Sequence, residues 1–68
     1  MNIRYVRDPS FRIMGSIETR GDGKQLARDH RLAVLGEYDP KSDVTRDGRL
    51  LVVGQGNQLP ALIARFYP

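Results

Sequence analysis

The sequence contains no cysteine, no tryptophan and a single histidine, His30, among its 68 residues. Without cysteine the chain can form neither disulfides nor thiolate metal sites. One histidine has no matched partner for a metal centre or for general acid–base catalysis, so we expect no metal, no cofactor and no enzymatic activity. Domains of this size usually gain stability from disulfides, a metal or a partner subunit. Association with a second copy is therefore the expected source of further burial.

Long apolar runs are also absent. The longest aliphatic run, residues 50–53, falls far short of the roughly 20 residues that a membrane span requires. Charged residues near the start stand where a secretory signal peptide has an apolar stretch. Hydrophobic residues nevertheless make up 40% of the chain, which is enough for a folded core. We expect one domain covering residues 1–68, located in the cytoplasm, with no membrane among its partners.

The chain also carries only a small net charge. Eleven Lys and Arg residues stand against eight Asp and Glu residues, which leaves a formal net charge of +3. The two signs are interspersed along the chain, without a block of either. A charge of this size mainly affects solubility and weak binding of anions.

What the sequence does contain is one motif written three times, near residues 5–15, 26–36 and 44–54. Each copy reads apolar, any residue, Arg-Asp, two spacers, apolar, any residue, two apolar residues, Gly. The equivalent residues are Tyr5/Leu26/Val44, Arg7/Arg28/Arg46, Asp8/Asp29/Asp47, Phe11/Leu32/Leu50, Ile13/Val34/Val52, Met14/Leu35/Val53 and Gly15/Gly36/Gly54. Such internal repetition predicts a repeated structural unit.

Each copy joins a short strand to a longer one. Apolar and polar residues alternate along residues 11–20, which predicts a strand with Phe11 and Ile17 on the same face. Turn residues such as Asp, Pro and Gly separate the strands, and short connections favour antiparallel pairing. The sequence thus predicts a mainly β fold. It is an antiparallel meander of about six short strands, arranged as three similar hairpins, with a short C-terminal helix.

A glycine closes each copy of the motif, at Gly15, Gly36 and Gly54. Glycine weakens a strand because it has no side chain to pack. Its recurrence predicts a bulge, a sharp bend or a close crossing of backbones at these positions.

The helix is predicted near residues 58–66, where apolar residues recur at helical spacing and Asn57 or Gln58 stands at the cap position. A helix of about two turns is not stable alone, so it must dock on an apolar surface. The predicted seat is the second face of the last two long strands. The residues expected to form this packing and the dimer contact are Leu35, Leu51, Val53, Leu59, Leu62, Ile63 and Phe66.

The repeated Arg-Asp-x-x-x-Leu-x-Val-Gly wording, with the run from Gly54 to Leu59, resembles a group of small bacterial proteins whose activity is not established. The resemblance covers about residues 15–63. It implies an intertwined, domain-swapped homodimer built of β-hairpins, and it implies no catalytic or ligand-binding residue. A swap between near-identical hairpins exchanges contacts at little cost.

The recurring Arg-Asp pairs admit two interpretations. In one, the arginines bind nucleic-acid phosphates, with Tyr5 and Tyr38 as stacking platforms. The candidate arginines are Arg7, Arg28, Arg31, Arg46 and Arg49. In the other, each aspartate caps turn amides and each arginine pairs across strands, while the tyrosines belong to the core. The second interpretation is favoured, because clustered charge is lacking.

The remaining candidates point to no chemistry. His30 aligns with Pro9 and Gly48 in the other copies, so we expect an exposed loop histidine. The acids at positions 39, 43 and 47 lack the spacing of a calcium loop. The favoured function is a non-enzymatic, homodimeric scaffold or protein-interaction module whose protein partner is unknown. The alternative is weak nucleic-acid binding through the hairpin-turn arginines, and a hydrolase or transferase comes third.

Overall fold

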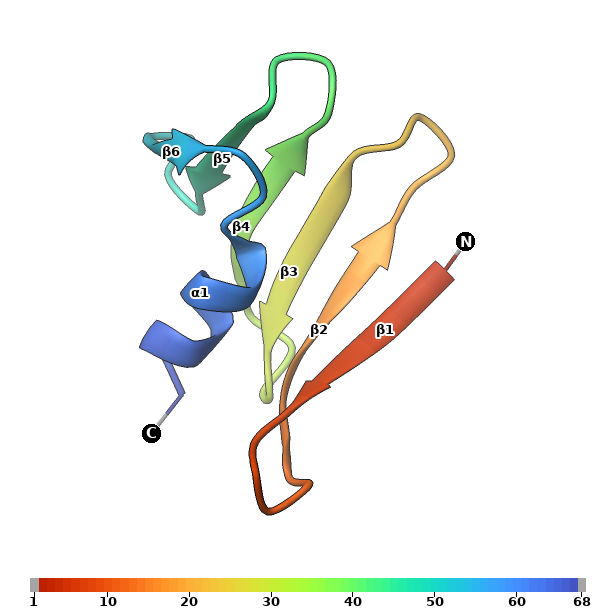
Figure 1. The fold of residues 1–68 in the computed structure, drawn as a ribbon, viewed down its shortest axis with the longest axis vertical. Coiled ribbons are helices and arrows are strands. Elements are labelled where there is room, and N and C mark those ends of the chain that lie inside the picture. The colour runs from red at the N-terminus through yellow and green to blue at the C-terminus, as the bar shows by residue number, and fades with distance from the viewer. Residues whose placement is uncertain (1, 68) are drawn as a thin grey trace.

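The structure is a computed structural model that describes residues 2–67. Over this range six strands form one antiparallel sheet in chain order, and one short helix lies on one of its faces (Figure 1). The elements are β1 Asn2–Arg7, β2 Ile13–Thr19, β3 Gln25–Asp29, β4 Val34–Asp39, β5 Val44–Asp47, β6 Val52–Gln55 and α1 Leu59–Arg65. The predicted mainly β meander with a C-terminal helix is confirmed.

A β-bulge recurs at the same place in each of the three repeated hairpins. In the first hairpin Arg7 pairs with Ile13 and Val6 pairs with Gly15, so Met14 has no residue opposite. Leu35 and Val53 are the equivalent residues in the other two hairpins. A bulge interrupts the alternation of side chains between the two faces. As a result Met14 and Leu35 pack against the core beside α1 instead of pointing away from it.

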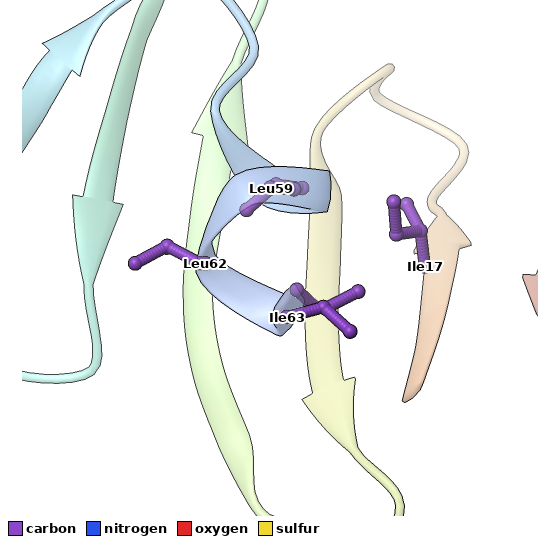
Figure 2. Close-up of a cluster of buried hydrophobic side chains, with 5 residues drawn as sticks. Ile17, Leu59, Leu62 and Ile63 are labelled. Carbon is purple, nitrogen blue, oxygen red and sulfur yellow. The ribbon is translucent and has the colours of Figure 1, made fainter. Parts of the chain in front are cut away.

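The core lies between α1 and strands β2, β3 and β4. Leu59, Leu62 and Ile63 of the helix are buried on the sheet, and Figure 2 shows Ile63 and Ile17 of β2 pointing toward each other. Ala27 of β3 is buried beneath the same helix. One face of the short helix thus supplies three of the five residues of the buried cluster, and small residues of the sheet such as Ala27 leave room for the helix.

Two glycines make this close approach possible. A Cβ atom on Gly15 would collide with the carbonyl oxygen of Arg28, and one on Gly36 would collide with that of Arg46 and lie 2.8 Å from Leu62 Cδ1. The predicted close crossing of backbones is therefore confirmed at these two positions. Gly54 differs, because a Cβ there would meet Gln58 only at an ordinary contact distance of 3.6 Å.

Two side chains, Thr45 of β5 and Asn57, hold the start of α1 through hydrogen bonds. The hydroxyl of Thr45, which is fully buried, donates to the carbonyl of Gly56 at 2.7 Å and accepts from the amide of Gln58 at 2.9 Å. Asn57 Oδ1 accepts from the amide of Leu59 at 3.1 Å. Of the two predicted caps, Asn57 is the residue whose side chain bonds to the helix, and Gln58 makes no such bond.

The predicted seat of the helix is partly wrong. Leu35 is half-buried and packs against the core, but Leu51 and Val53 are exposed, and so is Phe66 at the end of α1. The helix instead covers the face that bears Ile17 and Ala27. Small residues on that face leave space for a close helix, which a hydrophobicity pattern does not register.

The two edges of the sheet are β1 and β6. On β1, Ile3 and Tyr5 are exposed, so the expectation that Tyr5 belongs to the core is wrong. Tyr38 does pack against the core, and its hydroxyl donates to Asp43 at 2.7 Å. That hydrogen bond raises the pKa of the Tyr38 phenol.

Candidate functional site: the three repeat loops

The loops that follow the Arg-Asp pairs share one hydrogen-bond pattern. In each, a carboxylate oxygen of the aspartate accepts from the backbone amides two and four residues further on. The donors are Ser10 and Arg12 for Asp8 (2.8 and 3.0 Å), Arg31 and Ala33 for Asp29 (2.8 and 2.9 Å), and Arg49 and Leu51 for Asp47 (2.8 and 3.1 Å). The turn interpretation of these aspartates is confirmed.

The backbone closes the same loops a second time. Each aspartate amide donates to the carbonyl four residues on, and its carbonyl accepts from the amide three residues on, at 2.9–3.0 Å. Each loop is therefore held by four hydrogen bonds around one aspartate. Loops fixed by this many bonds can hold a backbone conformation that is unfavourable on its own.

Amide donors also act on the acidity of two of the aspartates. For Asp29, the hydrogen bond from the amide of Ala33 lowers the pKa below its ordinary value. For Asp8, partial desolvation raises the pKa, but the bonds from the amides of Arg12 and Ser10 outweigh it, and the net shift is downward. Hydrogen bonds to the ionised form favour that form, so both carboxyls are held as carboxylates.

The fourth residue of each loop has a positive φ angle: 66° at Phe11, 70° at Leu32 and 67° at Leu50. Their side chains are 79%, 72% and 69% exposed. The expectation that this strand begins at Phe11 is therefore wrong. The strand begins at Ile13, because the loop needs five residues to close around the aspartate.

The three loops lie at one end of the sheet, which we call the loop end. They are residues 8–12, 29–33 and 47–51, and each joins an odd strand to the following even strand (Figure 1). In an antiparallel meander all such connections lie at the same end. The opposite end carries the loops at residues 20–24 and 40–43.

The end of the chain connects to all three loops. The Tyr67 hydroxyl donates to Asp8 Oδ2 at 3.2 Å, and its ring meets the His30 ring edge-on with centroids 5.8 Å apart. Phe66 borders a hollow of about 340 Å³ with Val34 and Arg49. His30 is exposed in its loop, as predicted.

The structure does not bring the five candidate arginines into one arrangement. Arg7 Nη1 donates to the carbonyl of Phe11 at 3.0 Å, and Arg28 Nη1 forms a 2.8 Å ion pair with Glu18. Arg46 is half-buried beside a hollow of about 280 Å³ that Glu37 also lines. Arg31 and Arg49 are exposed in their loops. Three of the five therefore have structural neighbours, and two project freely from the loop end.

The formal charge is distributed unevenly along the chain. Residues 7–12, 28–33 and 46–51 each contain two arginines and one aspartate, so each repeat carries +1 and the three together carry +3. That equals the whole formal charge of the chain, because the other five basic and five acidic residues cancel. The loops at residues 8–12, 29–33 and 47–51 hold three arginines and three aspartates, so the excess comes from Arg7, Arg28 and Arg46 on the strands.

No family model, curated protein or solved structure matches this chain. The resemblance to a group of small bacterial proteins therefore stays a prediction. Among residues 2–67, no group of three His, Asp or Glu residues is placed to hold a metal ion. No helix in this range is long and apolar enough to cross a membrane.

Proposed function

We propose that this protein is a non-enzymatic, homodimeric interaction module. One observation carries the proposal: over residues 2–67, eleven large hydrophobic side chains are exposed, whereas six hydrophobic residues are buried. Exposed apolar surface on this scale marks a contact surface in soluble proteins. A second copy of the chain is the partner that is always present at matching concentration.

The edge strand β1 is the part of the molecule that suits a second copy best. Ile3 and Tyr5 are exposed on it, and the helix packs on β2, β3 and β4. Beside it, Arg4 and Ile17 border a hollow of about 180 Å³. An edge strand offers unpaired backbone groups to a further strand, and natural proteins usually cover such an edge. Pairing of β1 with a partner would satisfy these groups and cover both apolar side chains.

The dimer is proposed to be intertwined through exchange of α1. The helix supplies Leu59, Leu62 and Ile63 to the core, and the segment before it contains Gly56 at a φ of +78°. A short segment with a permissive glycine can redirect a helix onto a neighbouring copy while keeping the same contacts. The repeated hairpins support the same idea, because equivalent surfaces recur in both chains.

Light scattering coupled to size exclusion tests the proposal at micromolar concentration. We expect a mass of twice 7.7 kDa for the natural sequence and 7.7 kDa for the double variant Ile3→Lys, Tyr5→Lys. A matched control, Leu32→Ser, changes an exposed apolar residue away from β1 and should stay dimeric. A monomeric natural chain at every concentration would refute the dimer.

Subunit mixing tests the exchange of α1. Two differently tagged dimers that merely pair at an edge should trade subunits rapidly. An exchanged helix must leave the core first, so mixed dimers should form only as slowly as the chain unfolds, with both rates rising together in urea. Mixing that is fast and independent of urea would exclude the exchange while leaving the dimer intact.

Weak nucleic-acid binding is the second candidate, favoured by the exposed Arg31 and Arg49 and by the +3 charge of the repeats. Its test is titration of fluorescent single-stranded DNA and RNA at two salt concentrations. Affinity that falls with salt, and falls further in Arg31→Ala with Arg49→Ala, would support it. Absence of binding at low salt would remove it.

A further inference from the structure

The glycine that closes the third repeat differs from the other two, because nothing in one copy of the chain requires it. A Cβ atom on Gly15 or Gly36 would collide with a backbone carbonyl of the strand that follows. Around Gly54, within residues 2–67 and apart from its neighbours in the chain, the nearest atom belongs to Gln58 and would lie 3.6 Å from such a Cβ, an ordinary contact distance. The φ angle of Gly54 is not positive either. Neither space nor backbone conformation therefore explains this glycine.

What Gly54 lacks is the first strand of a following hairpin. Contacts between successive hairpins repeat along the sheet: β2 pairs with β3, β4 pairs with β5, and each contact sets the glycine opposite the aspartate of the next Arg-Asp pair. The carbonyls that exclude a Cβ belong to Arg28 in the first contact and to Arg46 in the second. β6 is an edge of the sheet, so this contact is missing beside Gly54. The equivalent arginine with an open side is Arg7, on the other edge strand, β1.

The two edge strands do not meet within one copy. They are the first and last strands of an open sheet and lie on opposite sides of the molecule (Figure 1). Both carry exposed apolar side chains, Ile3 and Tyr5 on β1 and Val52 and Val53 on β6. An exposed apolar edge favours pairing with a further strand. A second copy supplies a strand for each edge, and the second copy's β1 matches β6 in the way that β3 matches β2 and β5 matches β4.

We propose that β6 of one copy pairs with β1 of a second copy, antiparallel and in the register of the inner hairpin contacts. This inference rests on the proposed homodimer and specifies which strands form it. The register sets Gly54 opposite Asp8 of the partner subunit and Gln55 opposite Arg7 of the partner subunit. Because β6 ends at Gln55, the partner's β1 continues beside residues 56–58, which lead to α1. Two copies that pair reciprocally leave neither edge of either sheet open.

The side chains at the two edges fit this pairing. Gln58 Nε2 donates to the carbonyl of Gln55 at 3.0 Å, so a flexible side chain occupies an edge where the inner strands have a neighbouring backbone. Both inner contacts also set a glutamate against an arginine. Glu18 and Arg28 form a 2.8 Å ion pair, and Glu37 pairs directly with Arg46 in the register of β4 and β5. In the proposed contact the residue opposite the partner's arginine is Gln55, which is polar but uncharged.

Disulfide cross-linking tests the register, because the chain has no cysteine of its own. Arg7→Cys and Gln55→Cys chains are prepared separately, unfolded together in urea, refolded and oxidised. We expect a covalent dimer with one chain of each kind, because residues opposite each other on paired strands lie within reach of a disulfide. Neither variant alone should cross-link. Arg31→Cys mixed with Gln55→Cys is the matched control, since Arg31 is exposed in a loop away from β1, and it should not cross-link either.

Two substitutions on β6 test the contact without cysteine. Gly54→Ala fits within one copy but places a methyl group against the partner's Arg7 carbonyl, so the circular dichroism spectrum should stay native while the dissociation constant of the dimer rises at least about tenfold. Gly21→Ala, where no atom lies within 4 Å, is the matched control and should leave that constant unchanged. Gln55→Glu adds the carboxylate found in the inner contacts and should lower the constant about twofold to fivefold at low salt. That gain should disappear in the Arg7→Ala background.

The outcomes separate this inference from the homodimer on which it rests. Cross-linking of Arg7→Cys with itself would set β1 against β1, and a Gly54→Ala chain that dimerises like the natural one would remove the close contact at β6. Either result overturns the inference and leaves the homodimer standing. A mass of 7.7 kDa at every concentration removes both proposals. A mass that grows with concentration, with the mixed cross-link still forming, would support the contact between β6 and β1 and replace the closed dimer by an open chain of copies.

Discussion

Both ends of the sheet contain loop residues with positive φ angles, but the residue types at these positions differ. At the opposite end, positive φ angles occur at Gly23 (90°) and Asp43 (55°), residue types that adopt them readily. At the loop end, the corresponding positions hold Phe11, Leu32 and Leu50. One end therefore follows the conformational preference of its residues and the other departs from it three times. The difference places the unfavourable backbone conformations of bulky residues at the loop end.

The hydrogen bonds of the two ends differ in the same direction. At the opposite end, Asp22 accepts from the amide of Lys24 and Asp39 from that of Lys41, one bond each at 3.0 and 2.9 Å. At the loop end each aspartate side chain accepts two amide bonds. Strained backbone persists where its surroundings fix it more firmly than usual. The second bond is thus the feature that lets a bulky residue stand at the tip.

The largest effect should come from the core that holds both ends. Ile63→Ala removes a fully buried side chain that packs toward Ile17, and should cost about 2–5 kcal/mol of unfolding free energy. A core of this size rarely supplies more than about 3–5 kcal/mol, so most of the chain should unfold at 25 °C. Urea denaturation followed by circular dichroism measures the change. The exposed Arg65→Ala on the same helix is the control, and a loop substitution that costs more than Ile63→Ala would contradict the ranking.

Removing an aspartate should cost more at the loop end than at the opposite end. Asp29→Ala removes the acceptor of two loop amides and Asp22→Ala removes the acceptor of one, so the urea midpoint should fall about twice as far for Asp29→Ala. Urea midpoints of the two variants give the difference. Asp29→Asn keeps a carbonyl acceptor and should recover most of the loss. Equal costs for Asp29→Ala and Asp22→Ala would mean that the second bond contributes nothing.

A reciprocal exchange of residue types tests the strain directly. Leu32→Gly relieves a left-handed conformation that costs about 1–2 kcal/mol, less the entropy that glycine loses on folding, and should stabilise the chain by about 0.5–1 kcal/mol. Gly23→Leu introduces the same strain at the opposite end and should destabilise by about 1–2 kcal/mol. Thermal melts of both variants, with Gly21→Ala as a control where no atom lies within 4 Å, measure the pair. Destabilisation by Leu32→Gly would show that the leucine is packed.

The smallest effect concerns acidity at the loop end. The pKa values of Asp8 and Asp29 lie below the ordinary value of an aspartate carboxyl, because backbone amides donate to both carboxylates and, at Asp8, these bonds outweigh the desolvation that raises the pKa. Stability from a lowered pKa is fully present above the unfolded value and is lost as the pH falls through the folded value. Urea midpoints should therefore decline as the pH falls below about 4. The double variant Asp8→Asn, Asp29→Asn should flatten this decline, and an unchanged decline in this variant would show that the two aspartates do not cause it.

Much of the fold was predictable because its signals are local. The threefold motif predicted three hairpins, the alternation along residues 11–20 predicted most of β2, and the spacing of Leu59, Leu62 and Ile63 predicted α1. The aspartates were assigned correctly to turns, since their side chains bond to amides within four residues. Interactions of this range can be derived from the order of residues alone.

The features that sequence reasoning missed depend on geometry with no local signal. Phe11 continues the alternating pattern of β2 by coincidence, so nothing marked it as a loop residue. The bulge at Met14 shifts the register by one residue, and an apolar pair before glycine is its only trace. The surface that holds the helix is lined by glycine and Ala27, and their small size lets the helix approach the sheet closely. The four residues between each Arg-Asp pair and the next strand could have indicated the loop.

The strand order also has a consequence for how the protein folds. Every strand pairs with its immediate neighbour in the chain, so each pairing closes a short segment and the mean separation of contacting residues is low for a β protein. Hairpins of this kind form in about 1–10 μs, and chains dominated by local contacts fold faster than sandwiches or barrels. The contacts with the longest reach involve the last segment, where α1 docks on Ile17 and Tyr67 donates to Asp8. Refolding should accordingly show rapid sheet formation, with the helix contact as the slowest event of a fast reaction.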